Sequence, residues 1–176
     1  MDGGSTIIYI AAQLVQSGGE DKTIITPNCF VIKCLCGKVR ELRLVGGKLW
    51  PERSSTLEFP PCDFETQEIT KSFVSLDGLS CDKGIYCAKE YVDTKRRVIA
   101  ATKNQIVFVC NHSKIGCTSG HCFITFDELA EREKDFLVLT DNNLTNEGKQ
   151  DQRRFEVEMV KLREKFPEGK FVSVSV

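Results

Sequence analysis

The fold prediction depends most on the stretch Cys110-Asn-His112-Ser-Lys-Ile-Gly-Cys117-Thr-Ser-Gly-His121-Cys122. It contains three of the nine cysteines and both histidines of the chain. A second short motif, Cys34-Leu-Cys36-Gly-Lys, lies upstream. Thiolate and imidazole groups are the ligands that Zn²⁺ prefers in structural sites. The pattern therefore predicts a bound zinc ion that stabilises the fold, in preference to a set of unrelated buried cysteines.

The main zinc site is expected to join these two motifs, because a closed structural site needs four ligands on a tetrahedron. A glycine after Cys36 and another before Cys117 would let backbone amides turn toward the sulfur atoms. The four ligands predicted for this site are Cys34, Cys36, Cys110 and Cys117. The alternates are His112, His121 and Cys122, and which of these three ligates stays open. A second site would use Cys62, Cys81 and Cys87, completed by His121 or Cys122.

The two ligand pairs also carry a resemblance to a known family. Cys34-x-Cys36-Gly37, followed by Phe108-Val-Cys110, a six-residue gap and Cys117, resembles the GRF-type zinc finger, as do residues 123–128 after it. The segment between the pairs is longer here, and the Gly-Arg-Phe core of that family is absent. The resemblance implies a small β-rich module that binds zinc and contacts nucleic acid.

Length and composition favour a single domain over residues 1–176. A chain of this length can bury a core of its own, and 41% hydrophobic with 28% charged residues is typical of globular proteins. Residues 1–124 show mainly β-rich runs, whereas residues 125–176 contain the helical patterns. The prediction is an α+β fold with a predominantly antiparallel β-sheet or small barrel and two C-terminal helical segments, stabilised by zinc.

Individual elements follow from periodicity and turn chemistry. One helix is predicted to begin at the capping-box pattern Thr125–Glu128. A second helix places four large apolar residues along one face, namely Phe155, Met159, Leu162 and Phe166. The predicted strands are Ile7–Val15, Cys29–Lys33, Glu41–Leu44, Lys48–Trp50, Ser72–Leu76, Ile85–Val92, Val98–Thr102, Ile106–Val109, Phe136–Leu139 and Phe171–Val176.

No stretch approaches the roughly 20 apolar residues of a membrane span. The apolar run Ile7–Ala12 lacks a basic leader and is a poor secretory signal, so we expect an intracellular protein, cytoplasmic or nuclear. Two N-glycosylation patterns, Asn111–Ser113 and Asn143–Thr145, together with the cysteine count, keep a secreted, disulfide-linked effector as an alternative.

A cysteine-dependent enzyme is the other alternative. A nucleophilic thiol needs a base within hydrogen-bond reach. The candidates are then Cys34, Cys36, Cys62 or Cys87 with His112 or His121. No His-Glu-x-x-His motif is present, and the glycine pairs at residues 18–19 and 46–47 lack the Lys-Ser/Thr of a phosphate loop. We therefore expect binding rather than catalysis.

Basic residues gather around the Cys-x-Cys motif, although the net charge of −1 gives no global attraction to nucleic acid. Cations that neutralise phosphates beside an aromatic ring that stacks on a base are typical of single-strand binding. The segment Lys95–Arg97 adds a second cluster, expected at a hairpin tip. The candidate nucleic-acid-binding residues are Lys38, Arg40, Arg43, Lys48, Trp50, Arg96 and Arg97.

The predicted function is a non-catalytic, zinc-binding interaction or regulatory module. It would contact a protein or a nucleic acid, either RNA or single-stranded DNA, through the surface around the Cys-x-Cys motif. The identity of the partner and the oligomeric state stay open.

Overall fold

The computed structural model describes residues 1–57, 68–132, 135–142, 148–166 and 169–174. The α-helices in these residues are α1 (Thr6–Gln16), α2 (Cys29–Leu35), α3 (Val92–Ala101), α4 (Phe126–Glu131) and α5 (Lys149–Lys165). Short 3₁₀ helices lie at η1 (Pro51–Arg53), η2 (Lys89–Tyr91) and η3 (His112–Lys114). No helix in this part of the chain is long and apolar enough to cross a membrane.

Four sheets are formed by the described strands. The largest is parallel, in the order β11 (Phe171–Val174), β10 (Asp135–Asp141), β8 (Thr102–Val109) and β5 (Ile69–Ser75). A separate parallel pair consists of β1 (Thr23–Thr26) and β2 (Glu41–Leu44). The antiparallel sheets are β3 (Lys48–Trp50) with β4 (Ser55–Leu57), and β6 (Gly78–Ser80), β7 (Gly84–Cys87) and β9 (His121–Ile124) in that order.

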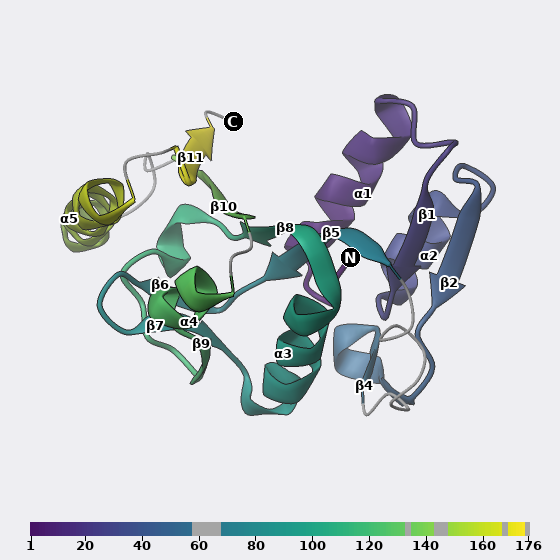
Figure 1. Ribbon diagram of the computed structural model, residues 1–176, viewed down its shortest axis with the longest axis horizontal. Coiled ribbons are helices and arrows are strands. Elements are labelled where there is room, and N and C mark those ends of the chain that lie inside the picture. Colours follow the sequence, from purple (N-terminus) through teal and green to yellow (C-terminus); the bar gives the residue numbers. More distant parts are fainter. Residues whose placement is uncertain (58–67, 133–134, 143–147, 167–168, 175–176) are drawn as a thin grey trace.

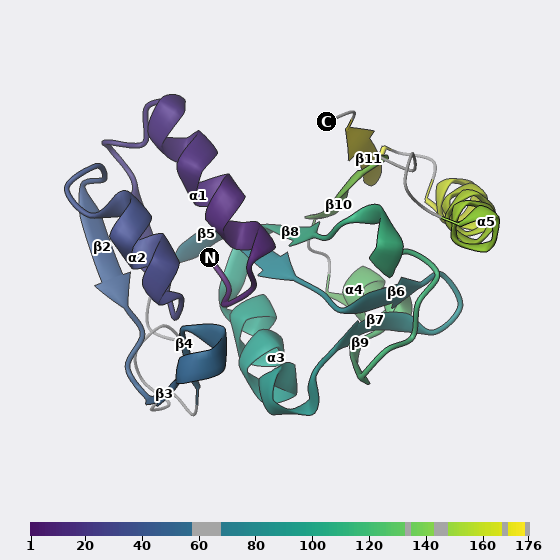
Figure 2. The ribbon, with the colours of Figure 1, turned by 180° about the vertical axis from the view of Figure 1, so that it is seen from behind.

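The four-stranded sheet buries side chains on both faces, which is usual for a parallel sheet. Alternate residues of β8 divide between two cores, with Ile106 and Phe108 on one side and Val107 and Val109 on the other. The first core includes side chains of α3, α4, α5 and the β6–β7–β9 sheet, and the second includes those of α1 and α2. Figures 1 and 2 show α1 and α3 on opposite sides of β5 and β8.

The segment Ile7–Val15, predicted as a strand, lies within helix α1. Its β-branched content favours a strand, but the helix buries Ile7 and Ala11, which are spaced by about one helical turn. Both side chains pack in the core formed with Val107 and Val109 of β8. Burial against the sheet therefore overrides the local propensity.

The segment Cys29–Lys33, also predicted as a strand, lies within helix α2. The helix begins after Asn28, whose side chain accepts hydrogen bonds from the amides of Phe30 and Val31. A side-chain acceptor at this position satisfies amides that have no partner inside the helix. The prediction of a strand was wrong because this N-cap was read as a turn.

The predicted antiparallel character is wrong for the main sheet, whose strand pairs are all parallel. The segment Val98–Thr102 was predicted as a hairpin strand, but its first four residues form the last turn of helix α3. Its last residue, Thr102, begins strand β8. Helix α3 also contains Lys95–Arg97, so this cluster is not a hairpin tip. Only the first part of Ile85–Val92 is a strand, in β7. Helical crossovers allow parallel pairing, but the many short strands predicted from the sequence favoured an antiparallel sheet over a doubly wound one.

The mixed α+β class and the two C-terminal helices are confirmed. Thr125 forms the capping box with Glu128 at the start of α4, and α5 buries Phe155, Met159 and Leu162. The strand predicted at Phe136–Leu139 lies within β10. The division into one domain stays a prediction.

Candidate functional site

A cleft of about 1330 Å³ opens at the carboxyl ends of the parallel strands. Its walls include Asn28 after β1, Asp77 after β5, Cys110 after β8 and Asp141 at the end of β10. The loop Asp2–Thr6, which leads into α1, forms a further wall. Ligands of open α/β sheets bind outside the carboxyl ends of the strands. This cleft is therefore the candidate functional site.

Two glycines allow the loop before α1 to pack closely against its neighbours. A Cβ atom on Gly3 would lie 2.6 Å from the hydroxyl oxygen of Ser55, and one on Gly4 would clash with the side chain of Ser75. Distances below 3.0 Å do not occur for ordinary Cβ contacts. The loop can hold this position only because both residues lack a side chain.

Asn28 fixes the direction of the same loop. Its Nδ2 donates hydrogen bonds to the carbonyl oxygens of Gly3 at 3.0 Å and Gly4 at 3.3 Å. In a trans peptide the carbonyl and the following amide point in opposite directions, so the amides of Gly4 and Ser5 point away from Asn28. Among the described residues, no protein acceptor is found for these two amides or for that of Thr6. They lie at the N-terminus of an 11-residue helix, where backbone amides and the helix dipole favour an anion.

A buried ion pair ties the loop to the sheet. Lys95 of α3 contacts the carboxylate of Asp2, and its Nζ also donates to the carbonyl oxygen of Ser75 at 2.7 Å. The amide and hydroxyl of Ser75 donate to the same carboxylate at 2.9 and 2.6 Å. Burial alone would raise the pKa of Asp2, but the charge of Lys95 and the hydrogen bonds from Lys95, Ser75 and Gly3 hold this pKa below its usual value. Asp2 is therefore an anion that positions the loop.

The remaining walls supply both cations and carboxylates. Arg53 and Lys114 lie on the cleft wall and provide positive charge there. Asp77 accepts a hydrogen bond from the amide of Ala88 at 2.9 Å, which holds its carboxylate in place. The carboxylate of Asp141 contacts the Nδ1 atom of the His112 ring. The cleft thus combines amide donors at one wall with carboxylate acceptors at others.

The family model of the DeoR C terminal sensor domain matches residues 1–132 of the chain. The chain belongs to this family. The match includes the loop Asp2–Thr6, Asn28, Asp77 and Lys95, so most of the cleft of this DeoR-type sensor domain lies inside the matched region. No curated protein matches the chain. The regulatory class predicted from the sequence is confirmed at this coarse level.

The four main zinc ligands predicted from the sequence lie on separate elements of the sensor domain. Cys34 belongs to α2 and Cys36 follows it directly, whereas Cys110 follows β8 and Cys117 follows η3. Within the described residues, no three His, Cys, Asp or Glu side chains gather as a metal site requires. Zinc stabilisation therefore has no support in the structure and stays a sequence prediction.

The alternate ligands have other contacts. His112 meets Asp141 and stacks edge-on against Phe155 of α5, with ring centroids 6.3 Å apart. The thiol of Cys122 donates to the carbonyl oxygen of Lys83 at 3.3 Å. His121 begins β9 and is exposed. Of the predicted second site, Cys81 and Cys87 are buried, whereas Cys62 lies outside the described residues.

Burial also determines the chemistry of two thiols. Cys110 and Cys87 pack in the core that contains Ile106 and Phe108 of β8, and burial raises the pKa of each thiol to about 12. A thiol with such a pKa is protonated near neutral pH and is a poor nucleophile. This burial argues against Cys87 as the nucleophile of a cysteine-dependent enzyme.

The predicted nucleic-acid-binding residues come from two regions of the sensor domain. Lys38, Arg40, Arg43, Lys48 and Trp50 lie between the end of α2 and the end of β3. Arg43 pairs with Glu41 at 2.7 Å, and Arg40 donates to Thr23 at 3.0 Å. Arg96 and Arg97 lie on α3, where Arg96 donates to the carbonyl oxygen of Phe123 at 2.8 Å. Because several of these cations already have protein partners, their role in nucleic-acid binding stays a prediction.

The loop Asp2–Thr6 was not among the sites predicted from the sequence. Its glycine pair is followed by Ser and Thr before an apolar segment, which differs from the phosphate-loop motif. Ser and Thr near a helix start, with a periodic apolar face after them, are the signal that would have found it.

Proposed function

We propose that this chain is the effector-sensing domain of a transcriptional repressor, and that its effector is a small phosphorylated sugar or polyol. The effector would bind in the cleft at the carboxyl ends of the parallel strands. An intracellular location fits this role, because phosphorylated metabolites are intracellular signals.

The observation that carries the proposal is that the amides of Gly4, Ser5 and Thr6 have no acceptor within the part of the chain that the structure describes. These amides belong to the N-terminus of α1, which opens into the cleft. Phosphate binds well at such a site because several N–H groups and the helix dipole act on it together. Lys114 and Arg53 add positive charge on the cleft wall.

The carboxylates of the cleft support the sugar part of the proposal. Asp77 and Asp141 accept hydrogen bonds and would take them from ligand hydroxyls. The same carboxylates would repel a second phosphate group that lay near them. A monophosphate with several hydroxyl groups therefore fits the polarity of the cleft.

Isothermal titration calorimetry tests the proposal with a panel of pentose and hexose monophosphates. The corresponding unphosphorylated sugars and inorganic phosphate serve as matched ligands. We expect one or more sugar phosphates to bind at least about tenfold more tightly than either matched ligand, because both halves of the ligand contribute. Equal affinity for the sugar and its phosphate would contradict the role of the loop.

The variant Ser5→Asp separates binding from folding. An acidic side chain at the start of α1 interacts favourably with the helix dipole, so the melting temperature should not fall. The added charge should weaken phosphate binding by about tenfold or more through repulsion. Ser5→Asn is the neutral control of nearly equal size, and it should retain most of the affinity. If Ser5→Asp binds as tightly as Ser5→Asn, the phosphate does not lie at this loop.

A contact with nucleic acid, or with a protein partner, remains a second proposal for the surface that carries Arg40 and Arg43. Replacing both by Gln would lower the affinity for RNA or single-stranded DNA and reduce its dependence on salt, if this surface binds phosphates. Unchanged binding would place any nucleic-acid contact elsewhere.

A further inference from the structure

Helix α5 has an outer face that the core does not cover. Phe155, Met159 and Leu162 are buried on one side of the helix, in the core that contains the β6–β7–β9 sheet. On the opposite side, Val157 is 51% exposed and Val160 is 54% exposed. Figures 1 and 2 show α5 at the end of the molecule away from β1 and β2. The outer face of α5 is therefore open to another molecule.

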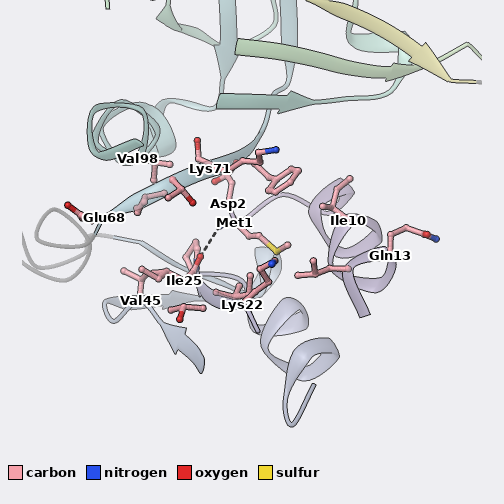
Figure 3. A pocket seen from close by; sticks show the side chains of 18 of the residues that line it. Met1, Asp2, Ile10, Gln13, Lys22, Ile25, Val45, Glu68, Lys71 and Val98 are labelled. Atoms are coloured by element: carbon pink, nitrogen blue, oxygen red, sulfur yellow. Dashed lines mark hydrogen bonds between the residues drawn. The ribbon is translucent and has the colours of Figure 1, made fainter. Parts of the chain in front are cut away.

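Apolar side chains also line an inner cavity of about 600 Å³, but there they face one another. Ile10 and Leu14 of α1 lie on its wall together with Ile25 of β1 and Val98 of α3. Figure 3 shows Ile10, Ile25 and Val98 around this cavity. The two valines of α5 differ from these residues because they are turned to solvent, so that only another molecule can cover them.

The outer face of α5 consists of a line of four residues with charges at its two ends. Arg153, Val157, Val160 and Glu164 are spaced by four, three and four positions, which places them along one side of a helix. All four side chains are exposed. We call these four residues the α5 stripe. Its order along the helix is positive, apolar, apolar and negative.

The α5 stripe is complementary to itself when a second copy lies antiparallel to it. A two-fold axis between Val157 and Val160 would place each of these valines opposite the other valine of the second copy. The same axis would place Arg153 opposite Glu164 of the second copy, and every such contact would occur twice. A parallel pair would instead oppose like charges at both ends of the stripe, which is unfavourable. The order of charges therefore favours an antiparallel pair.

The charged residues beside the stripe agree with this arrangement. Glu156 and Arg163 are exposed and lie on the same flank, seven positions apart, so each would approach the other residue of the second copy. On the other flank, Lys161 is paired at 3.1 Å with a carboxylate of its own chain. Arg154 on that flank donates to the carbonyl oxygen of Ser113 at 3.2 Å. One flank thus adds opposite charges, and the cations of the other flank have partners within each copy.

Contacts with the rest of the chain hold α5 in a fixed position. The ring of Phe155 meets the ring of His112 edge-on, with centroids 6.3 Å apart. The Nε of Arg154 donates to the carbonyl oxygen of Ile115 at 3.4 Å. A surface that is already ordered loses less conformational entropy when it binds a partner. The α5 stripe is therefore presented as a preformed surface.

We propose that two copies of this chain associate through α5, with the two helices antiparallel about a two-fold axis that passes between Val157 and Val160. The valines of both copies form the apolar centre of the contact, and pairs of Arg153 with Glu164 close its two ends. A pair of helices buries less surface than a permanent dimer needs, so the dissociation constant should be on the order of 10 µM. No α5 residue lines the cleft, so the contact does not depend on which effector binds there.

Sedimentation equilibrium of the 176-residue chain, at about 5 to 200 µM, tests the proposal together with charge-reversed variants. Arg153→Glu would oppose two carboxylates at each end of the stripe, and Glu164→Arg would oppose two guanidinium groups. Each change should weaken association by about tenfold or more. The double variant exchanges the two charges and should restore the dimer. Residues 153 and 164 lie about 16 Å apart along one helix, so this recovery can arise only between two copies.

A mixture of the two single variants gives a second readout. In a mixed dimer every pair at the ends of the stripe has opposite charges again, so the mixture should associate more tightly than either variant alone. Such association would also show that both variants are folded. Lys33→Glu is the matched control, because Lys33 is exposed on α2, which packs in the other core. This variant changes the charge by the same amount and should leave the dissociation constant unchanged.

Three results would overturn the proposal. The chain could stay monomeric over the whole concentration range. It could form a dimer that neither Arg153→Glu nor Glu164→Arg weakens, which would place the contact on another surface. Finally, the double variant could associate as weakly as the single variants, which would exclude the antiparallel register.

Discussion

Lys95 and Asp2 lie 93 residues apart in the sequence and form an ion pair in which each residue is only 4% exposed. The pair joins α3 to the loop before α1, and Ser75 of β5 completes it with two hydrogen bonds to the carboxylate. Three elements that meet at the cleft are therefore held by one carboxylate. Removal of either charge would leave the other buried without a partner.

Lys95→Met should destabilise the domain by about 3–5 kcal/mol, because the charge of Asp2 then stays buried and uncompensated. The double variant Asp2→Asn with Lys95→Met should lose less than the sum of the two single changes, since no charge is left unpaired. Urea unfolding measures all three. Lys161→Met is the control: Lys161 pairs with Asp82 at 3.1 Å on the surface, and its loss should cost much less stability than the loss of Lys95. Equal losses at Lys95 and Lys161 would contradict a structural role for the buried pair.

Asn28→Ala should affect both stability and ligand binding. Asn28 caps α2 and also holds the carbonyl groups of Gly3 and Gly4, so its loss should cost about 1–2 kcal/mol and weaken sugar-phosphate binding several-fold. Urea unfolding and calorimetric titration give the two values.

Thr125→Ala is the matched control for Asn28→Ala. Thr125 caps α4 through a capping box, and it does not line the cleft. The control should lose a similar amount of stability and retain its affinity for the ligand. If both variants bind equally well, Asn28 does not position the phosphate-binding loop.

Cys36→Ser distinguishes the predicted zinc site from the observed fold. A structural zinc ligand is essential for folding, so the sequence prediction requires this variant to unfold or aggregate. In the structure Cys36 is exposed and follows α2, and no metal-binding group is found among the described residues. We therefore expect a melting temperature within about 1 °C of the original chain, as for other surface substitutions. Elemental analysis of the purified protein provides the independent measurement, and bound zinc together with an unfolded variant would restore the sequence prediction.

The parts of the fold that were predicted correctly have strong local signals. Thr125 and Glu128 satisfy each other's backbone at the start of α4, and Phe155, Met159 and Leu162 share one face of α5. These features depend on neighbours within one or two helical turns. They can therefore be read without knowledge of the rest of the chain.

The parts that were missed depend on distant partners. Ile7 and Ala11 are buried because α1 packs on residues of β8 about 100 positions later, and β-branched residues alone favoured a strand there. The cleft likewise requires Asp2, Asn28, Asp77 and Lys95, which the parallel topology brings together. The cysteine and histidine cluster led to the prediction of a zinc site, because spacing alone does not reveal whether thiols such as Cys110 are buried in a core.

The buried amino group of Met1 gives the stability of this chain a dependence on pH. Burial lowers the pKa of this group from 8.0 to about 6 in the folded state. Between pH 6 and pH 8 the unfolded chain then binds more protons than the folded chain, so the free energy of unfolding should rise with pH across this range, by about 2–3 kcal/mol. Urea unfolding at pH 6 and pH 8 measures the difference. A chain acetylated at Met1 has no ionisable group there and should lose most of the rise. If acetylation leaves the pH dependence unchanged, another group, such as a histidine, causes it, and the amino group of Met1 is not buried in solution.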